Sequence, residues 1–164
     1  PRRSSGLTRG YWVMRGYWGD DLATRTALDA ARGMHTGDLA TLDDEGYCRI
    51  VGRLKDLIIR GGENIYPREI EEFLYGHPDI QEVQVFGVPD PRLGEQVGAW
   101  IRLREGATTT EEAIREHCRR HLAYFKVPHH VRFVDDFPMT LTGKVQKYLM
   151  REAMIAELAG NAAD

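Results

Sequence analysis

The stretch from Gly52 to Pro67 reads GRLKDLIIRGGENIYP, and it marks the place where the sequence changes its pattern. Gly61-Gly62-Glu63-Asn64 lies between two short apolar runs, which predicts a β-hairpin over residues 56–65. Pro67 suits the first position of a helix, because proline lacks the N–H that would be unpaired there. The stretch therefore predicts a boundary between two parts of the chain near Arg53–Asp56, followed by a hairpin and a helix.

Upstream of this boundary, residues 7–60 show the pattern of short strands and turns. We expect a strand at Tyr11–Met14, a short helix at Asp20–Leu28, and strands at Leu39–Thr41 and Tyr47–Val51. The last two strands flank Asp43-Asp44-Glu45-Gly46. An acidic run that ends in glycine is typical of a hairpin turn, so these two strands are expected to pair.

Downstream of the boundary, helical and strand patterns alternate. Ile70, Phe73 and Leu74 recur at helical spacing, and Gly76 with Pro78 ends that helix. The remaining expected elements are strands at Val83–Val88 and Val97–Leu103 around a rigid turn at Val88–Pro91, a helix opened by the capping pair Thr109 and Glu112, a strand at His130–Val134 and a helix at Gln146–Leu158. This order predicts an α+β fold, with β-hairpins first and then a small domain whose short sheet is flanked by helices.

The composition is that of an ordinary globular protein, with 42% hydrophobic and 29% charged residues. A net charge of -3 gives no support to a nucleic-acid partner, and no apolar run reaches the ~20 residues of a membrane-spanning helix. Cys48 and Cys118 show no ligand spacing, so they predict free thiols in the cytoplasm and no metal site. Pro1 stands where a methionine is expected, which predicts a piece of a longer or processed protein.

The first motif that could carry chemistry is Thr36-Gly37-Asp38. A carboxylate beside a glycine can approach a ligand closely and accept hydrogen bonds from two neighbouring hydroxyl groups, as acidic residues do with ribose. The alternative is that Asp38 simply caps a turn, and the spacing alone favours that alternative.

The second motif is the basic segment 49–60 with the two glycines that follow it. Its charged residues are Arg49, Arg53, Lys55 and Arg60 against the single Asp56. A local positive field suits a phosphate-bearing ligand, and Gly61-Gly62 would let a slender ligand pass close to the main chain. A solvated basic hairpin with a glycine turn explains the same composition equally well.

The third motif is Thr140-Leu141-Thr142-Gly143-Lys144. A lysine at a helix start lies at the unfavourable end of the helix dipole, and a residue that breaks a local rule is a candidate for function. It is not a Walker phosphate loop, because Val145 follows the lysine where that loop has Ser or Thr. The alternative is a surface lysine on a flexible turn.

Together these motifs resemble the adenylate-forming superfamily, which includes acyl-CoA synthetases, adenylation domains of peptide synthetases and beetle luciferases. The matching stretches are Val13–Trp18, Met34–Ala40, Gly52–Glu72 and Pro138–Lys144. Within the superfamily, Gly61–Pro67 and Met139–Lys144 are most similar to bacterial medium- and long-chain fatty-acyl-CoA synthetases. Two positions depart from the pattern of some relatives: Leu93 replaces an aromatic residue over the CoA adenine, and Val127 replaces an arginine.

The resemblance implies a reaction in two steps, in which a carboxylate and ATP give acyl-adenylate and pyrophosphate, and CoA then displaces AMP. The implied roles are nucleotide binding for Asp38 and Arg53, catalysis for Lys144, a hinge for Lys55 and a pantetheine tunnel for Gly61, Gly62 and Glu63. The implied domains are residues 1–53 as the tail of a large N-terminal adenylation domain, 54–56 as the hinge and 57–160 as a C-terminal lid. ATP with its Mg²⁺ and the acyl group would bind mainly upstream, on the N-terminal domain of the same enzyme.

Other readings of the same resemblance stay open. An aryl-CoA ligase or a carrier-protein-loading adenylation domain would share these motifs, because the acyl pocket that separates them lies upstream. A non-catalytic lid that binds a partner or CoA is the alternative from a different class. By itself, the 164-residue chain is expected to be inactive.

Overall fold

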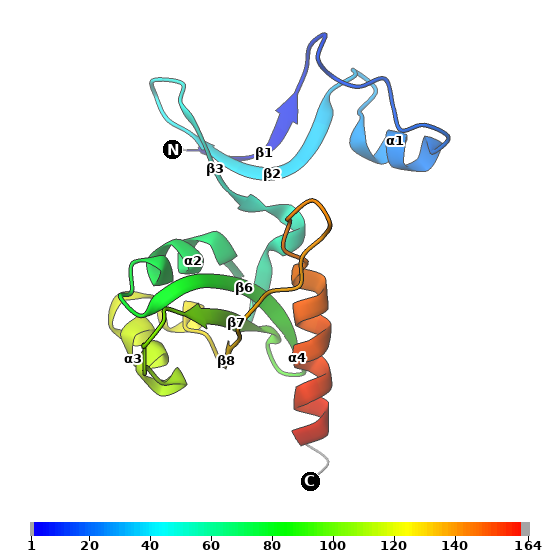
Figure 1. The fold of residues 1–164 in the computed structure, drawn as a ribbon. Helices are drawn as coiled ribbons and strands as arrows, with labels where there is room; N and C mark the ends of the chain where they lie inside the picture. Colours follow the sequence, from blue (N-terminus) through cyan, green and yellow to red (C-terminus); the bar gives the residue numbers. More distant parts are fainter. Residues whose placement is uncertain (1, 162–164) are drawn as a thin grey trace. The chain divides into compact units, whose positions relative to one another are not determined.

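The computed structural model describes residues 2–161 and divides the chain into two compact units, Pro1–Lys55 and Asp56–Asp164. Figure 1 shows the elements of both units along the chain. No helix within residues 2–161 is long and apolar enough to cross a membrane. Each unit has its own sheet, so each is described by itself.

The first unit is a three-stranded antiparallel sheet with one short helix. Its elements are β1 (Arg2–Thr8), α1 (Asp21–Ala27), β2 (Met34–Leu42) and β3 (Cys48–Arg53), in the strand order β1-β2-β3. The helix begins after Asp20, whose side chain accepts a hydrogen bond from Ala23 N at 2.8 Å. The predicted acidic hairpin is confirmed, because Asp43 Oδ1 accepts from Tyr47 N at 2.8 Å and closes the turn between β2 and β3.

The strand expected at Tyr11–Met14 is wrong, since this segment is a turn in which Val13 N donates to Gly10 O at 3.1 Å. The sheet strand lies earlier, at Arg2–Thr8, and together with β3 it occupies both edges of β2. Aromatic residues favour strands only where a partner strand is present to pair with them. Here no edge of β2 is left for Tyr11 and Trp12, and both rings are exposed.

The second unit is a mixed sheet with helices on both faces. Its elements are β4 (Ile58–Arg60), β5 (Glu63–Ile65), α2 (Pro67–Tyr75), β6 (Ile80–Asp90), β7 (Gly94–Leu103), α3 (Glu111–His121), β8 (His130–Phe133) and α4 (Lys147–Asn161), preceded by a short 3₁₀ turn at Leu54–Asp56 and with another at Tyr124–Lys126. The strand order is β5-β4-β7-β6, and β8 pairs in parallel with β7. The order of elements after Pro67 and the α+β class are as predicted.

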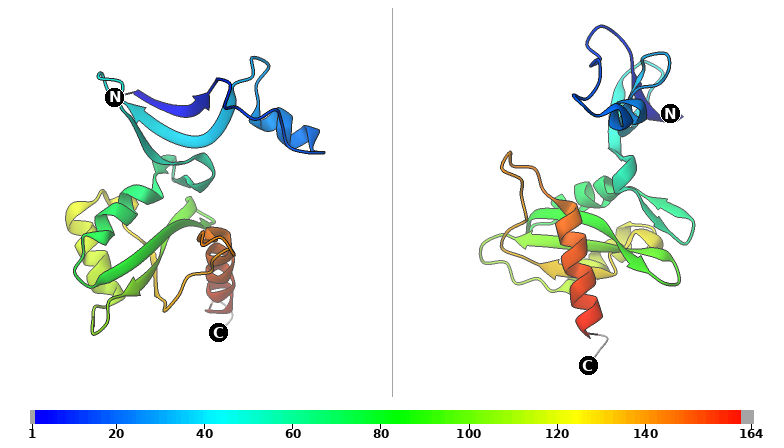
Figure 2. Two further views of the ribbon diagram at one scale, coloured as in Figure 1. Left: turned by 45° about the horizontal axis from the view of Figure 1, so that its top comes forward. Right: turned by 90° about the vertical axis from the view of Figure 1, so that its right-hand side faces the viewer.

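Alternation along β6 and β7 places the two cores on opposite faces of the sheet. One core joins residues of α2 and α3 to Val83 and Val85 of β6, and the other joins α4 to Phe86 and Val88 of the same strand. Figure 2 shows α4 lying across its own face of the sheet. Ile70 of α2 is fully buried, and such a side chain contributes about 1.5–3 kcal/mol to stability. Met150 and Met154 of α4 are also buried, so the loop before α4 is attached to a well-packed helix.

Two boundaries in the second unit differ from the prediction. The cap of α3 is Thr110, whose Oγ1 accepts from Ala113 N at 3.2 Å, so the pair Thr109 and Glu112 is wrong by one residue. β6 continues through Pro89 to Asp90, and the turn follows it. There Asp90 Oδ1 accepts the N–H groups of the next residues, Arg92 and Leu93, and this bonding holds the pKa of Asp90 below its ordinary value.

Candidate functional site

Asp38 and Arg53 lie side by side in the first unit. They are direct partners across β2 and β3, and Arg53 Nε donates to Asp38 Oδ1 at 3.0 Å. Gly37 has φ +72, and a Cβ placed on it would meet nothing within 4 Å. The carboxylate thus has a cationic neighbour and an open approach past Gly37. That arrangement can accept the hydroxyl groups of a ribose while the guanidinium adds positive charge.

Lys55, the expected hinge residue, is the last residue of the first unit and lies in the 3₁₀ turn Leu54–Asp56. Its side chain is exposed. A single helical turn of three residues has few internal hydrogen bonds to break, so its dihedral angles can change without breaking the strand pairing of either unit.

The Gly61-Gly62 pair forms a two-residue hairpin turn between β4 and β5. Their φ values are +57 and +88, as a type I′ turn requires, and Arg60 pairs with Glu63 across it. The four-residue turn expected at Gly61–Asn64 is therefore too long, and Glu63 belongs to β5. A Cβ on Gly62 would meet nothing within 4 Å, so a ligand can approach the backbone there.

Lys144 lies on a small closed loop that precedes α4. Thr140 N donates to Lys144 O at 2.8 Å, Lys144 N donates to Thr140 Oγ1 at 3.0 Å, and Gly143 at φ +76 makes the turn. The side chain is exposed, and within residues 2–161 no hydrogen bond or ion pair engages its Nζ. Backbone bonds thus define the loop and leave the ammonium group available.

The lysine at the start of the helix is Lys147, and the prediction that Lys144 occupies this position is wrong. α4 begins at Lys147, three residues beyond Lys144, and Lys147 is the cation at the helix start. Lys144 belongs to the loop, where the dipole has little influence. The functional prediction for Lys144 then depends on its free side chain and on its place in the motif.

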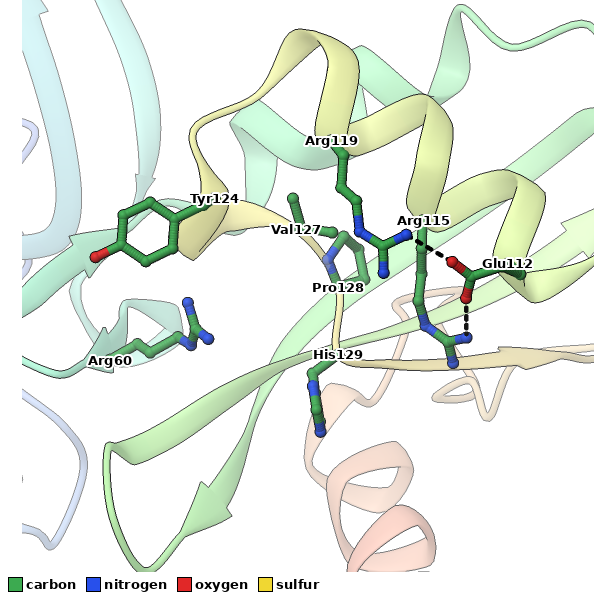
Figure 3. A pocket seen from close by; sticks show the side chains of 8 residues that line it. All are labelled: Arg60, Glu112, Arg115, Arg119, Tyr124, Val127, Pro128 and His129. Atoms are coloured by element: carbon green, nitrogen blue, oxygen red, sulfur yellow. Dashed lines mark hydrogen bonds and ion pairs between the residues drawn. The ribbon is translucent and has the colours of Figure 1, made fainter.

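A basic cavity of about 470 Å³ lies in the second unit and was not found from the sequence (Figure 3). Its lining residues are Arg60, Glu112, Arg115, Arg119, Tyr124, Val127, Pro128 and His129. Figure 3 shows Arg60 and Tyr124 on one side and the two arginines of α3 on the other. Three arginines and one glutamate line the cavity, and Arg115 and Arg119 also pair with Glu111 and Glu116 of α3 at 2.8 and 3.4 Å. Arginine forms the paired hydrogen bonds that phosphate oxygens accept, so the lining suits an anion carrying phosphate groups.

Ion pairs hold the arginines of α3 in place. Arg115 Nη1 lies 3.3 Å from Glu112 Oε2, and Arg119 also donates to Glu112. These contacts lower the pKa of Glu112 and raise that of Arg119, with the bond between those two side chains as the largest cause. Arg60 is held separately, because its Nε donates to Gln96 Oε1 at 2.7 Å. The one sequence signal for this cavity was the spacing of Arg115 and Arg119, one helical turn apart on α3.

The second unit thus combines helices on both faces of a short sheet with a glycine hairpin and an exposed lysine on a closed loop. Residues 69–144 match the family described as AMP-binding enzyme C-terminal domain. Residues 69–144, all in the second unit, therefore carry the C-terminal domain of AMP-binding enzymes, as the sequence motifs predicted.

Named relatives span almost the whole chain. YngI of Bacillus subtilis, which is named as an acyl-CoA synthetase, is 55% identical over 148 residues, covering 90% of this chain and 27% of its own length. The mitochondrial medium-chain acyl-CoA ligase ACSF2 of Rattus norvegicus is 52% identical over 146 residues, which are 89% of this chain and 24% of its own. The chain thus spans about a quarter of the length of these relatives.

Solved structures of the superfamily share the fold. ATP-bound MatB from Rhodopseudomonas palustris is 40% identical with a TM-score of 0.81, over 86% of this chain and 28% of that one. The o-succinylbenzoate CoA synthetase MenE from Bacillus subtilis, in complex with an acyl-adenylate, is 30% identical with a TM-score of 0.83, over 92% and 30% of the two chains.

Proposed function

We propose that the chain is the C-terminal part of an ATP-dependent acyl-CoA synthetase. In the first step a carboxylate oxygen attacks the α-phosphorus of ATP, an acyl-adenylate forms and pyrophosphate leaves. In the second step the CoA sulfur attacks the acyl carbon, the thiol proton is lost and AMP leaves. The observation that carries the proposal is the closed Thr140–Lys144 loop, which presents an ammonium group without a partner in the described part of the chain.

Lys144 would act in the first step. Two anions, the acid and the α-phosphate, must approach each other, and a preorganised cation between them offsets their repulsion. Asp38 and Arg53 would bind the ribose of the same nucleotide, which their ion pair and the open side at Gly37 support. Mg²⁺ would accompany ATP on the upstream domain, and in residues 2–161 no group of three or more His, Cys, Asp or Glu side chains could hold a metal ion.

The second step would use the glycine hairpin and the basic cavity of the second unit. The backbone at Gly61 and Gly62, with Glu63 beside it, offers room for the slender pantetheine arm. The three arginines of the cavity suit the phosphates of CoA. Leu93 and Val127 depart from the pattern of some relatives, and Arg115 and Arg119 of α3 would supply the charge that Val127 does not.

The domain roles follow from this division of the steps. Residues 1–53 would complete a large N-terminal adenylation domain, residues 54–56 with Lys55 would be the hinge, and residues 57–160 would be the lid. Rotation about the hinge would exchange Lys144 for the glycine hairpin between the two steps. We place the enzyme in the cytoplasm, because Cys48 and Cys118 are both free thiols.

A medium- or long-chain fatty acid is the proposed substrate, since the relatives at 50% identity and above include medium-chain acyl-CoA ligases. An aryl acid is the second candidate, because MenE, named for an aryl acid, shares the fold at 30% identity.

The test is CoA-dependent AMP release by the full-length protein that carries these residues, with octanoate, palmitate, benzoate and o-succinylbenzoate as acids. We expect release with the fatty acids. Release with the aryl acids alone would favour the second candidate, and no release with any acid would contradict the proposal. The 164-residue chain without its upstream domain should show no ATP–pyrophosphate exchange, and exchange by that chain would overturn the division of the site.

A further inference from the structure

Lys147, the first residue of α4, makes a closed set of hydrogen bonds with α2 and β6. Its Nζ donates to Glu71 Oε1 at 2.6 Å and to the main-chain oxygen of Val85 at 2.9 Å. Glu71 Oε1 also accepts from Val85 N at 2.8 Å. Three residues from three elements are thus joined at one point, and Val85 uses both of its backbone polar groups there.

The stability of α4 alone does not explain why a lysine occupies its first position. A cation in the first turn of a helix opposes the helix dipole, so local energetics disfavour lysine at this position. The side chains of Lys147 and Glu71 are only 23% and 15% exposed. Removing the lysine would leave a carboxylate largely buried without its cation, which is costly. The pair therefore fixes the start of α4 against α2 and β6.

The consequence reaches Lys144 through a short backbone path. Only two residues lie between the two lysines. Gln146 N donates to Pro138 O at 2.8 Å, and Met139 pairs with Val145 in a β-bridge. The loop is closed on itself, so its orientation depends on where α4 begins. Lys144 has no side-chain bond within residues 2–161, so in the described part of the chain only the backbone of the loop decides where its ammonium group can reach.

We propose that Lys147 is a positioning residue for adenylation. Its bonds to Glu71 and Val85 hold the loop at the angle at which Lys144 meets the reacting groups. The inference rests on the proposed function, because it assigns a role relative to Lys144. It adds that adenylation requires Lys147, whose side chain does not itself touch the substrate.

α4 also offers a matched control one turn further on. Arg151 Nη1 lies 2.9 Å from Glu95 Oε1, and Glu95 Oε2 accepts from Ile59 N at 2.9 Å. This second bridge has the same construction: a cation of α4, a carboxylate and a backbone amide of the sheet. It lies further along the helix from Lys144, so its loss should disturb the loop less.

The test uses the full-length protein and two assays: ATP–pyrophosphate exchange for the first step, and thioester formation from supplied acyl-adenylate for the second. A misplacement of about 1 Å can cost on the order of 100-fold in rate, so we expect Lys147→Met to lower kcat for exchange by about 10- to 100-fold. Thioester formation should stay within about twofold, and Lys147→Arg should restore most of the exchange rate. Arg151→Met should lower exchange less than Lys147→Met.

Two further variants keep the outcomes separate. Glu71→Gln keeps the acceptor for Val85 N and weakens the ion pair, so it replaces Lys147→Met if that variant does not fold. We expect Glu71→Gln to lower ATP–pyrophosphate exchange more than thioester formation. Equal losses in both steps, or normal exchange in Lys147→Met and Glu71→Gln, would overturn the positioning role. Lys144→Ala is measured in parallel. Normal exchange in Lys144→Ala would contradict the proposed function itself, whereas loss there with normal exchange in Lys147→Met would contradict only the inference.

Discussion

Arg53 donates from Nε to Asp38 Oδ1 at 3.0 Å, although the two residues are 15 positions apart in the chain. The hairpin between β2 and β3 makes them direct partners across the sheet. Two residues that belong to separate motifs in the sequence therefore form one ion pair. Cross-strand pairs of opposite charge stabilise a sheet modestly, so the pair itself has a structural role as well as the proposed one.

Asp38→Asn separates the structural role from the functional one. The pair is partly exposed, at 58% for Arg53 and 23% for Asp38, and exposed pairs contribute about 0–1 kcal/mol. We expect the free energy of unfolding in urea to change by no more than about that amount, while adenylation weakens strongly through a higher KM for ATP. Arg9→Ala is the control, because Arg9 and Asp29 form a pair of similar exposure in the same unit. A large loss of stability with normal adenylation would show that the pair is structural only.

Gly61→Asn tests the space at the glycine hairpin without breaking its turn. Asn-Gly is a preferred sequence for a type I′ turn, and a Cβ at Gly61 would lie 3.4 Å from Leu93 Cδ2, an ordinary contact. Stability should therefore be kept. We expect thioester formation from supplied acyl-adenylate to slow and ATP–pyrophosphate exchange to stay normal. Unchanged thioester formation would exclude a close passage of pantetheine along this backbone.

Lys55→Pro tests the hinge. Proline fixes its own φ and restricts the preceding residue, so it narrows the range of rotation at the 3₁₀ turn Leu54–Asp56. In the full-length protein, thioester formation should fall more than adenylation does. Lys55→Ala removes the charge and leaves the backbone free, and it should keep both steps. A loss of equal size in Lys55→Ala would assign the effect to the charge instead of the rotation.

The two cysteines should differ in reactivity. Burial raises the pKa of Cys118 to about 11, whereas Cys48 is exposed. Only the thiolate reacts, so titration of the native chain with a disulfide reagent at pH 8 should modify Cys48 rapidly and Cys118 only after denaturation. The raised pKa also means that Cys118 favours the folded state below its ordinary pKa of 9.0, and that this contribution is lost as the pH rises toward 11. Rapid modification of both thiols would contradict the packing of α3.

Local chemistry was enough to predict much of the second unit. Pro67 begins α2, Gly76 ends it, and the apolar runs around Val85 and Val97 became β6 and β7. These signals act within a few residues, where spacing and backbone preference decide the outcome. The strand expected at Tyr11–Met14 was wrong because strand formation depends on a partner that local sequence does not specify.

The parts of the site that the sequence did not predict are assembled over long distances. The basic cavity brings Arg60 of β4 opposite Arg115 and Arg119 of α3, more than 50 residues away (Figure 3). The bond from Lys147 to Glu71 joins residues 76 positions apart. No spacing rule covers such contacts, since they follow from the order of strands in the sheet. Asp38, Arg53 and Lys144 were recognised because their neighbours in sequence form motifs of a known family.

The most direct test of the central claim is Lys144→Ala in the full-length protein, measured in both half-reactions. The side chain is exposed and without a partner in the described residues, so the variant should fold and unfold as the original does. We expect ATP–pyrophosphate exchange with a fatty acid to be largely abolished, while thioester formation from supplied acyl-adenylate continues at close to its normal rate. Equal loss of both half-reactions, or normal exchange, would contradict the account.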